Sequence, residues 1–146
     1  PVLYKGREDE IKIGKGILLR DGTDVAIIAC GVLVHEAIIA AESLSEEGVN
    51  AAVVDMHTIK PLDHNLIDSL VEKCGAVVSA EDHSVIGGLG SAIAEYLSSN
   101  KPTPLEMIGV KDRFGESGQA DEMLELMELK SHHISKAAKR AIQRKS

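Results

Sequence analysis

Four short apolar segments, separated by stretches with helical periodicity, constrain the fold of this chain most. None of the four alternates strictly between apolar and polar residues, a pattern typical of strands that are covered on both faces. The intervening stretches place apolar residues three and four positions apart, on one side of a helix. This alternation predicts a three-layer α/β domain with a mainly parallel sheet. The four segments are residues 25–30, 51–54, 76–80 and 105–110.

Residues that commonly begin and end helices lie where this pattern requires them. Asp63 follows Pro61 as a candidate N-cap, and Gly48 and Gly75 follow helical stretches, as glycines at helix C-termini do. A further strand is expected before the first segment and two helices after the last. These additional elements are residues 15–19, 119–127 and 132–144.

Length, charge and composition narrow the classes of function. A chain of 146 residues is long enough for one domain with its own core. Its net charge of −7 and its three aromatic residues argue against nucleic-acid binding, which needs a basic face and stacking platforms. No apolar stretch approaches the roughly 18 residues of a spanning helix, and no signal peptide is recognisable, so we expect a cytoplasmic protein. Residues 1–14 read as a linker from an upstream domain, which leaves 15–146 as the folded domain.

The cysteines and the C-terminal charges have simple structural interpretations. Cys30 and Cys74 lie in apolar surroundings without CxxC spacing, so buried reduced thiols are expected. Residues 129–146 carry six Lys and Arg and no Asp or Glu. This segment is interpreted either as an amphipathic helix or as a basic helix that docks on an acidic partner or a phosphate-bearing ligand. In the first case its inward-facing residues are Ile134, Ala137, Ala138, Ala141 and Ile142.

Titratable residues follow the second and third apolar segments, at the predicted carboxyl ends of parallel strands. Open α/β sheets usually bind ligands at that edge. Carboxylates beside imidazoles can perform acid/base chemistry, because neighbouring charges shift their pKa values. Alternatively, these groups hydrogen-bond loop amides or a neighbouring domain. The set consists of Asp55, His57, Glu81, Asp82 and His83, and Arg113 after the fourth segment is a candidate counter-charge.

Glycines 87, 88 and 90 open a helix directly after this third segment. Their backbone amides can cradle an anion, but close packing of the helix explains Gly87, Gly88 and Gly90 equally well. The dinucleotide fingerprint GxGxxG fails because Ile93 occupies its last position, and no Walker sequence is present.

Three other motif-like strings fail on single residues. The zinc-binding pattern HExxH begins at His35 but has Ile39 at its second histidine, and the nucleophile pattern GxSxG ends at Gln119 instead of glycine. His132 and His133 are adjacent, so on a helix they point about 100° apart. We therefore expect both to face solvent and not to share a metal.

Four longer strings, in order, resemble the C-terminal domain of the transketolase family of thiamine-diphosphate enzymes. Similar modules occur in deoxyxylulose-phosphate synthase and in the beta subunit of 2-oxo acid dehydrogenases. The DRFGESG sequence favours transketolase, and especially the separate C-terminal subunit of split enzymes. A departure is Met127-Glu128-Leu129, where the family often has a Tyr-Gly-Leu-type sequence. The four strings are GKGILLRDGTDVAIIACG, VVDMHTIKPLD, VVSAEDHSVIGGLGSAIAEYL and IGVKDRFGESGQADEMLEL.

This resemblance implies a five-stranded mixed sheet whose first strand is antiparallel. It also implies an enzyme that transfers a two-carbon ketol unit between sugar phosphates. Thiamine diphosphate and a divalent metal such as Mg²⁺ are then held by other domains, in agreement with the lack of a GDG string here. No residue of this chain is expected to be catalytic or to bind cofactor or metal, and the chain alone is expected to be inactive.

The resemblance gives the predicted strand-end set a role in assembly. Its members would contact the cofactor-binding domains or the second subunit of a homodimer, with the glycines permitting close approach. Because the chain starts at Pro1 and not at Met, this interpretation is favoured over an autonomous regulatory module that binds a small anion.

Overall fold

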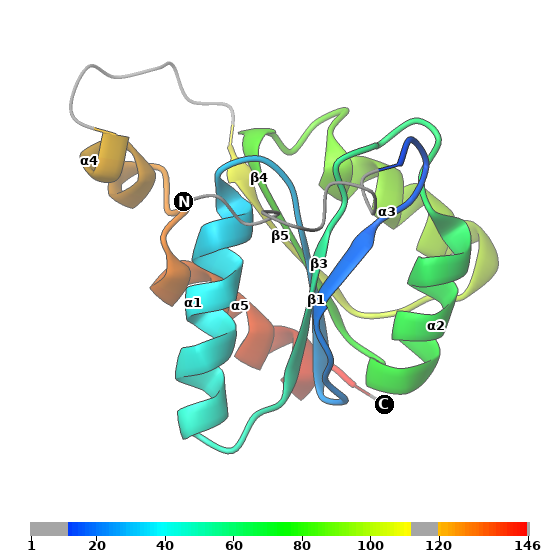
Figure 1. Cartoon of the computed structure of the whole chain (residues 1–146), viewed down its shortest axis with the longest axis horizontal. Coiled ribbons are helices and arrows are strands. Elements are labelled where there is room, and N and C mark those ends of the chain that lie inside the picture. The colour runs from blue at the N-terminus through cyan, green and yellow to red at the C-terminus, as the bar shows by residue number, and fades with distance from the viewer. Residues whose placement is uncertain (1–11, 112–119, 146) are drawn as a thin grey trace.

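A five-stranded sheet lies between two layers of helices (Figure 1). The computed structural model describes residues 12–111 and 120–145. Helices α1 and α5 cover one face of the sheet and α2 and α3 cover the other, while α4 lies outside these layers. The elements in chain order are β1 (Ile17–Arg20), β2 (Val25–Ala29), α1 (Leu33–Glu46), β3 (Ala51–Asp55), α2 (His64–Cys74), β4 (Val77–Ser84), α3 (Leu89–Asn100), β5 (Leu105–Val110), α4 (Ala120–Leu126) and α5 (Ser131–Gln143).

The order of strands confirms the predicted architecture. The sheet runs β1-β3-β2-β4-β5, and the strands β2 to β5 run parallel to one another. Only β1 is antiparallel, paired with β3 through Ile17 and Asp55. Two boundaries at the predicted site differ from expectation. Asp55 belongs to β3, and β4 continues to Ser84, so Glu81, Asp82 and His83 belong to that strand and do not follow it.

The central strand β2 explains why the apolar segments lack alternation. All five of its residues are fully buried because both faces of the sheet are covered. Successive side chains enter different cores, since their directions alternate along a strand. Val25, Ile27 and Ala29 pack with α1 and α5, whereas Ala26, Ile28 and Cys30 pack with α2 and α3.

Local hydrogen bonds confirm the predicted helix signals around α2. The carboxylate of Asp63 accepts the Leu66 amide at 3.2 Å and the Gly16 amide at 2.9 Å, so it caps α2 and also ties down the approach to β1. Gly75 ends the helix with a φ of 71°, the left-handed conformation that glycine adopts without strain. No helix among the described residues is long and apolar enough to cross a membrane.

The C-terminal helix α5 is amphipathic, as the first of the two interpretations predicts. Ile134, Ala137, Ala138 and Ala141 are fully buried against the sheet and α1, and Ile142 packs at their border. The two cysteines are free thiols inside the protein, as expected.

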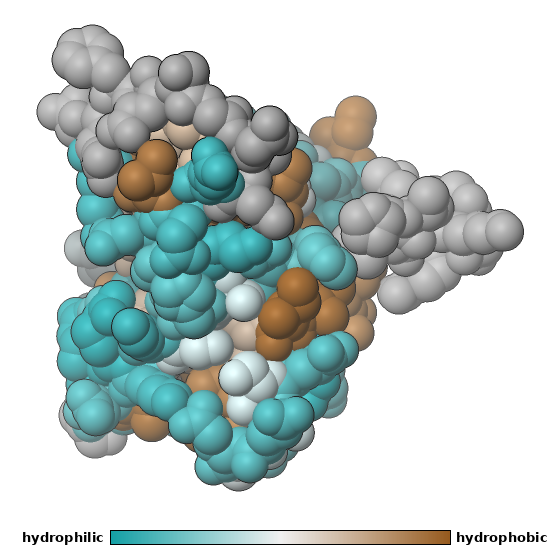
Figure 2. Space-filling view, turned by 90° about the vertical axis from the view of Figure 1, so that its left-hand side faces the viewer, coloured by the Kyte–Doolittle hydropathy of each residue, from teal (hydrophilic) through white to brown (hydrophobic). Residues whose placement is uncertain are grey.

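The surface on the α1 side of the molecule is largely hydrophilic. Figure 2 shows its apolar side chains as separate groups among polar ones, without one broad apolar patch. Large apolar contact surfaces usually mark interaction sites, so this face offers little support for an extensive hydrophobic interface.

Candidate functional site

The carboxyl edge of the parallel strands brings several predicted site residues together. Cys30 follows β2, Asp55 ends β3, and Glu81 and Asp82 lie near the end of β4. Burial, followed by the charges of these three carboxylates, raises the pKa of the Cys30 thiol to about 12. The thiol is therefore neutral at physiological pH and is neither a nucleophile nor a good metal ligand.

Glu81 holds the start of α3. Its side chain is fully buried, and its two oxygens accept the backbone amides of Leu89 and Gly90, each at 2.8 Å. The first amides of a helix lack partners within the helix and attract negative charge. Glu81 therefore supplies, from the neighbouring strand, the anion that the glycine-rich helix start requires. Both of its oxygens are occupied by this structural role.

The glycines of this segment permit that contact. A Cβ on Gly88 would collide with the Glu81 Oε1, and one on Gly90 would lie 2.8 Å from both the Ser79 Oγ and the Met107 Sδ. Gly87 has a φ of 77°, which disfavours other residues. Of the two interpretations of these glycines, the geometry supports close packing, since the amides that could cradle an external anion already bind Glu81.

Among the remaining described members of the predicted set, Asp82 and His83 lie within ion-pair distance of each other, and His57 contacts the chain before β1. The Asp82 Oδ1 is buried without a hydrogen bond, and the nearest imidazole nitrogen, the His83 Nε2, is 3.5 Å away. The His83 side chain is 68% exposed. The His57 Nε2 lies 2.8 Å from the carbonyl oxygen of Lys12, so this ring contacts the incoming chain. Arg113 lies outside the described residues.

Exposed apolar side chains stand in the loops that leave this edge. Val32, after β2, is 57% exposed, and Ile86, after β4, is 76% exposed. Both positions belong to loops at the carboxyl ends of parallel strands.

The described residues of the edge do not fit a diphosphate. Three carboxylates meet there, and the Leu89 and Gly90 amides at the start of α3 are occupied by Glu81. The chain also lacks a GDG string.

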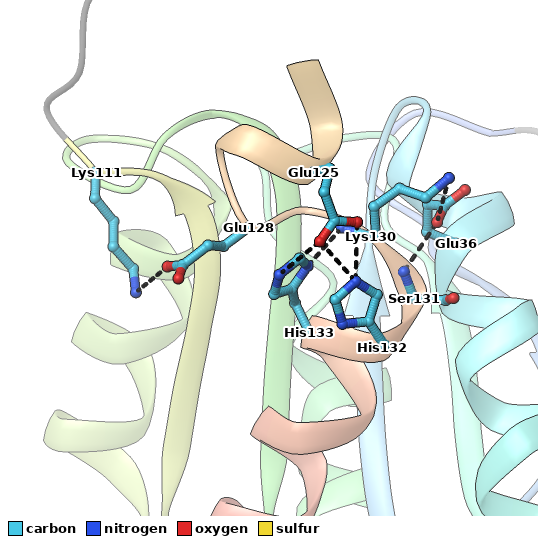
Figure 3. Close-up of polar contacts among 8 residues, drawn as sticks. All are labelled: Glu36, Lys111, Glu125, Glu128, Lys130, Ser131, His132 and His133. Carbon is cyan, nitrogen blue, oxygen red and sulfur yellow. Dashed lines mark hydrogen bonds and ion pairs between the residues drawn. The ribbon is translucent and has the colours of Figure 1, made fainter. Parts of the chain in front are cut away.

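A second cluster of titratable groups corrects the expectation for the adjacent histidines (Figure 3). The His132 Nε2 lies 3.0 and 2.9 Å from the two carboxylate oxygens of Glu125, and the His133 Nε2 lies 3.7 Å from one of them. The two rings are 3.9 Å apart. His133 is only 15% exposed, and its burial and the charge of His132 lower its pKa despite nearby carboxylates. Thus the rings do not point apart, and only His132 faces solvent.

A buried carboxylate that sequence reasoning missed supports this cluster. Glu36 of α1 is 7% exposed and accepts the Ser131 amide at 2.9 Å, and the Lys130 Nζ lies 3.9 Å from the same carboxylate (Figure 3). The only sequence signal at Glu36 is its place in the failed HExxH string. Its partner lies 95 positions away, beyond the reach of any local pattern.

Comparisons with known proteins agree on one family. The model of the family described as "Transketolase, C-terminal domain" matches residues 14–134. The 6-deoxy-6-sulfo-D-fructose transketolase subunit of Clostridium sp. (strain MSTE9) is 48% identical over 99% of this chain and 45% of its own length. A 1-deoxy-D-xylulose-5-phosphate synthase of Trichormus variabilis is 41% identical over 92% of this chain and 21% of its own length.

A solved structure described as "Split gene transketolase, inactive beta4 tetramer" has the same fold. It superposes with a TM-score of 0.90 at 43% identity, covering 93% of this chain and 45% of that one. The chain thus spans less than half the length of the relatives it matches. The match of the family model to most of the chain, together with these likenesses, shows that the chain belongs to the transketolase family, as its C-terminal domain.

Proposed function

We propose that this chain is the assembly domain of a transketolase that transfers a two-carbon ketol unit from a ketose to an aldose phosphate. Thiamine diphosphate, with a divalent metal such as Mg²⁺, supplies the electron sink for that chemistry. In this proposal other domains bind the cofactor, and the domain described here contributes a rigid edge on which they dock. Homodimeric assembly completes the enzyme.

The observation that carries this proposal is that the buried Glu81 and Cys30 side chains at the carboxyl edge of the parallel strands are not available for chemistry. Glu81 is occupied by the α3 amides, and the Cys30 thiol is neutral, so neither is available for proton transfer. Val32 and Ile86, in the loops after β2 and β4, instead expose apolar side chains. An edge of this kind can exclude water and orient a neighbouring domain. In this proposal its carboxylates also repel anionic substrates from the carboxyl edge, which takes no part in the reaction.

The solved relative is an inactive beta4 tetramer, which supports the expectation that a C-terminal subunit alone is inactive. An activity assay tests the proposal. This chain, alone and with the cofactor-binding section of the same enzyme, is supplied with thiamine diphosphate and Mg²⁺. The donors are fructose 6-phosphate and 6-deoxy-6-sulfofructose, tested side by side. Ketol transfer only in the combined sample is expected. Formation of 1-deoxyxylulose 5-phosphate and carbon dioxide from pyruvate and glyceraldehyde 3-phosphate would instead place the chain in the synthase branch.

The docking edge is tested by charge substitutions at exposed positions. Val32→Glu and Ile86→Glu remove no buried contact, so the domain should still fold, yet each should weaken association with the cofactor-binding section at least tenfold. Ile39→Glu, at a 38% exposed position on α1, is the matched control. Equal association constants for all three variants, measured by analytical ultracentrifugation, would show that the carboxyl edge is not the contact surface.

A further inference from the structure

Three side chains with metal-ligating atoms converge where α4 meets α5. We propose that Glu125, His132 and His133 form a surface site for a divalent transition metal, with zinc as the best fit. Their ligand atoms all lie within 4.8 Å of one another. In a tetrahedral zinc site, bonds of about 2.0–2.1 Å place neighbouring ligand atoms about 3.4 Å apart. From the Glu125 Oε1, the Nε2 atoms of His132 and His133 lie 3.0 and 3.7 Å away, on either side of this value.

The donor set determines which metal is favoured. Two imidazole nitrogens and one carboxylate oxygen suit zinc and its neighbours among the transition metals, whereas Mg²⁺ and Ca²⁺ prefer oxygen ligands alone. The side chains of Glu125 and His132 are 55% and 51% exposed, so the solvent side of the site can accept a water molecule as fourth ligand. This arrangement corresponds to three protein ligands with one open position.

The framework behind the ligands is held from three directions. Glu36 binds the Ser131 amide at 2.9 Å and so fixes the first turn of α5 to α1. Leu129, in the connection between the helices, is buried in the core shared by α1 and α5. The Leu129 amide donates to the Leu124 carbonyl at 2.7 Å, which closes the end of α4. Both helices therefore hold their ligands in place before a metal arrives.

Hydrogen bonds of both histidines must change when metal binds. The His132 Nε2 can no longer donate to the Glu125 carboxylate. The His133 Nδ1 accepts the Lys130 amide at 3.1 Å, so in the free protein the neutral ring carries its proton on Nε2. A metal at Nε2 requires that proton on Nδ1, which then cannot accept from Lys130. Losing one hydrogen bond of ordinary strength weakens metal binding about fivefold. Zinc binding should therefore release the Lys130 amide.

Calorimetry with zinc tests the site in the polypeptide that carries this chain, freed of thiamine diphosphate and kept in excess Mg²⁺ to fill oxygen sites. One zinc equivalent is expected to bind, and His132→Gln and Glu125→Gln should each weaken binding tenfold or more, since even changes around metal ligands cost about 10–100-fold. Both side chains are about half exposed, so these variants should fold. His35→Gln, at an exposed histidine of α1, is the matched control.

Amide exchange supplies an independent measurement of the same site. Exchange at the Lys130 amide should become faster when zinc binds, and it should not change in His132→Gln at the same zinc concentration. The proposal is overturned if zinc fails to bind the unaltered protein, or if it binds all variants equally. It is also overturned if zinc binds while exchange at Lys130 stays the same, because His133 would then not be a ligand.

Discussion

The carboxylate of Glu81 occupies the place that a bound phosphate often takes at the start of a helix in α/β proteins. It comes from the strand next to the helix and binds two amides of α3 at 2.8 Å each. Gly88 makes room for it, since a Cβ there would collide with the Glu81 Oε1. The glycine-rich sequence therefore serves an internal anion, which explains why it resembles a phosphate loop without matching one.

Replacing Glu81 by Gln should destabilise the domain by about 1.5–3 kcal/mol, the usual range for hydrogen bonds to a charged group. The amide end of Gln has only one acceptor oxygen, so one buried helix amide would face an NH₂ group. Glu72→Gln, at an exposed position of α2, should change the free energy of unfolding by less than about 0.5 kcal/mol. Urea unfolding of both variants measures the difference, and similar midpoints would contradict the structural role of Glu81.

Glu128 adopts a conformation that glycine normally adopts. Its φ is 61°, and the amides of Glu128 and Leu129 donate back to the carbonyls of Glu125 and Leu124 at 3.1 and 2.7 Å. This is the Schellman arrangement, whose left-handed residue is usually Gly. Glu128 stands at the glycine position of the Tyr-Gly-Leu-type sequence common in the family. The departure noted in the sequence thus leaves the turn intact but places a side chain in a strained backbone.

Glu128→Gly is expected to stabilise the domain. A side chain in the left-handed region costs about 1–2 kcal/mol, while the greater freedom of glycine in the unfolded chain offsets about 0.4–1 kcal/mol. The ion pair with Lys111, at 4.0 Å between exposed side chains, contributes little. A net gain of about 0.5–1 kcal/mol should appear in thermal unfolding. Glu128→Ala keeps the strain, so an equal gain in that variant would refute this explanation.

At the scale of elements, the basic charge of α5 is partly neutralised within the domain. Glu106 of β5 accepts the Arg140 Nε at 2.9 Å and the Arg144 Nη1 at 2.5 Å, and Lys139 pairs with Glu47 at 2.6 Å. Burial tends to raise the pKa of Glu106, but the hydrogen bonds and charges of the two arginines outweigh it and hold this pKa below its usual value. The helix is therefore attached to the edge strand by charge as well as by apolar packing.

This lowered pKa predicts a pH dependence for the attachment of α5. The Glu106 carboxylate binds protons less readily in the folded protein than in the unfolded one. Its contribution to stability is therefore fully present above its pKa in the unfolded chain, and it is lost as the pH falls through its pKa in the folded protein. At pH 7, Glu106→Gln should lower the free energy of unfolding by about 0.5–1 kcal/mol. The difference from the unaltered protein should vanish in acid. A constant difference across the whole range would mean that charge is not the cause, and Glu42→Gln, an exposed residue of α1, is the control.

The helices and strands were predictable because the pattern of apolar residues in the sequence reflects which residues are buried. The side-chain clusters were not, because they depend on how elements distant in the sequence pack together. Apolar segments without alternation identified the four parallel strands, but β5 lies at the sheet edge and is only partly buried, so the expectation of full cover was wrong for it. Family resemblance identified the antiparallel β1. The position of Glu81 near the carboxyl end of a strand was predictable. Its hydrogen bond with the Leu89 amide was not, because it depends on how the start of α3 packs against that strand. The His132 and His133 spacing predicts backbone directions only. Their side-chain rotamers, which bring both rings to Glu125, are not contained in that spacing.

At the scale of the whole molecule, the sheet separates two apolar cores, and both cysteines belong to the same one. Cys30 enters the core under α2 and α3 from the carboxyl edge of β2, and Cys74 enters it from the last turn of α2. They are 7% and 3% exposed, and burial raises the pKa of each thiol. The two thiols thus report on the opening of a single core from two separate places.

If that core opens only by global unfolding, the two thiols should react with a thiol reagent at one common rate. At high reagent concentration, this labelling rate should equal the rate constant for opening of the core. When an added osmolyte stabilises the fold, the labelling rates of both thiols should fall in parallel. Single-cysteine variants, Cys30→Ala and Cys74→Ala, assign the signals, and denaturant should make both thiols react at once. A much faster reaction at Cys30 would show that the carboxyl edge opens separately. Because Glu81 anchors α3 at that same edge, Glu81→Gln should then accelerate labelling of Cys30 more than labelling of Cys74.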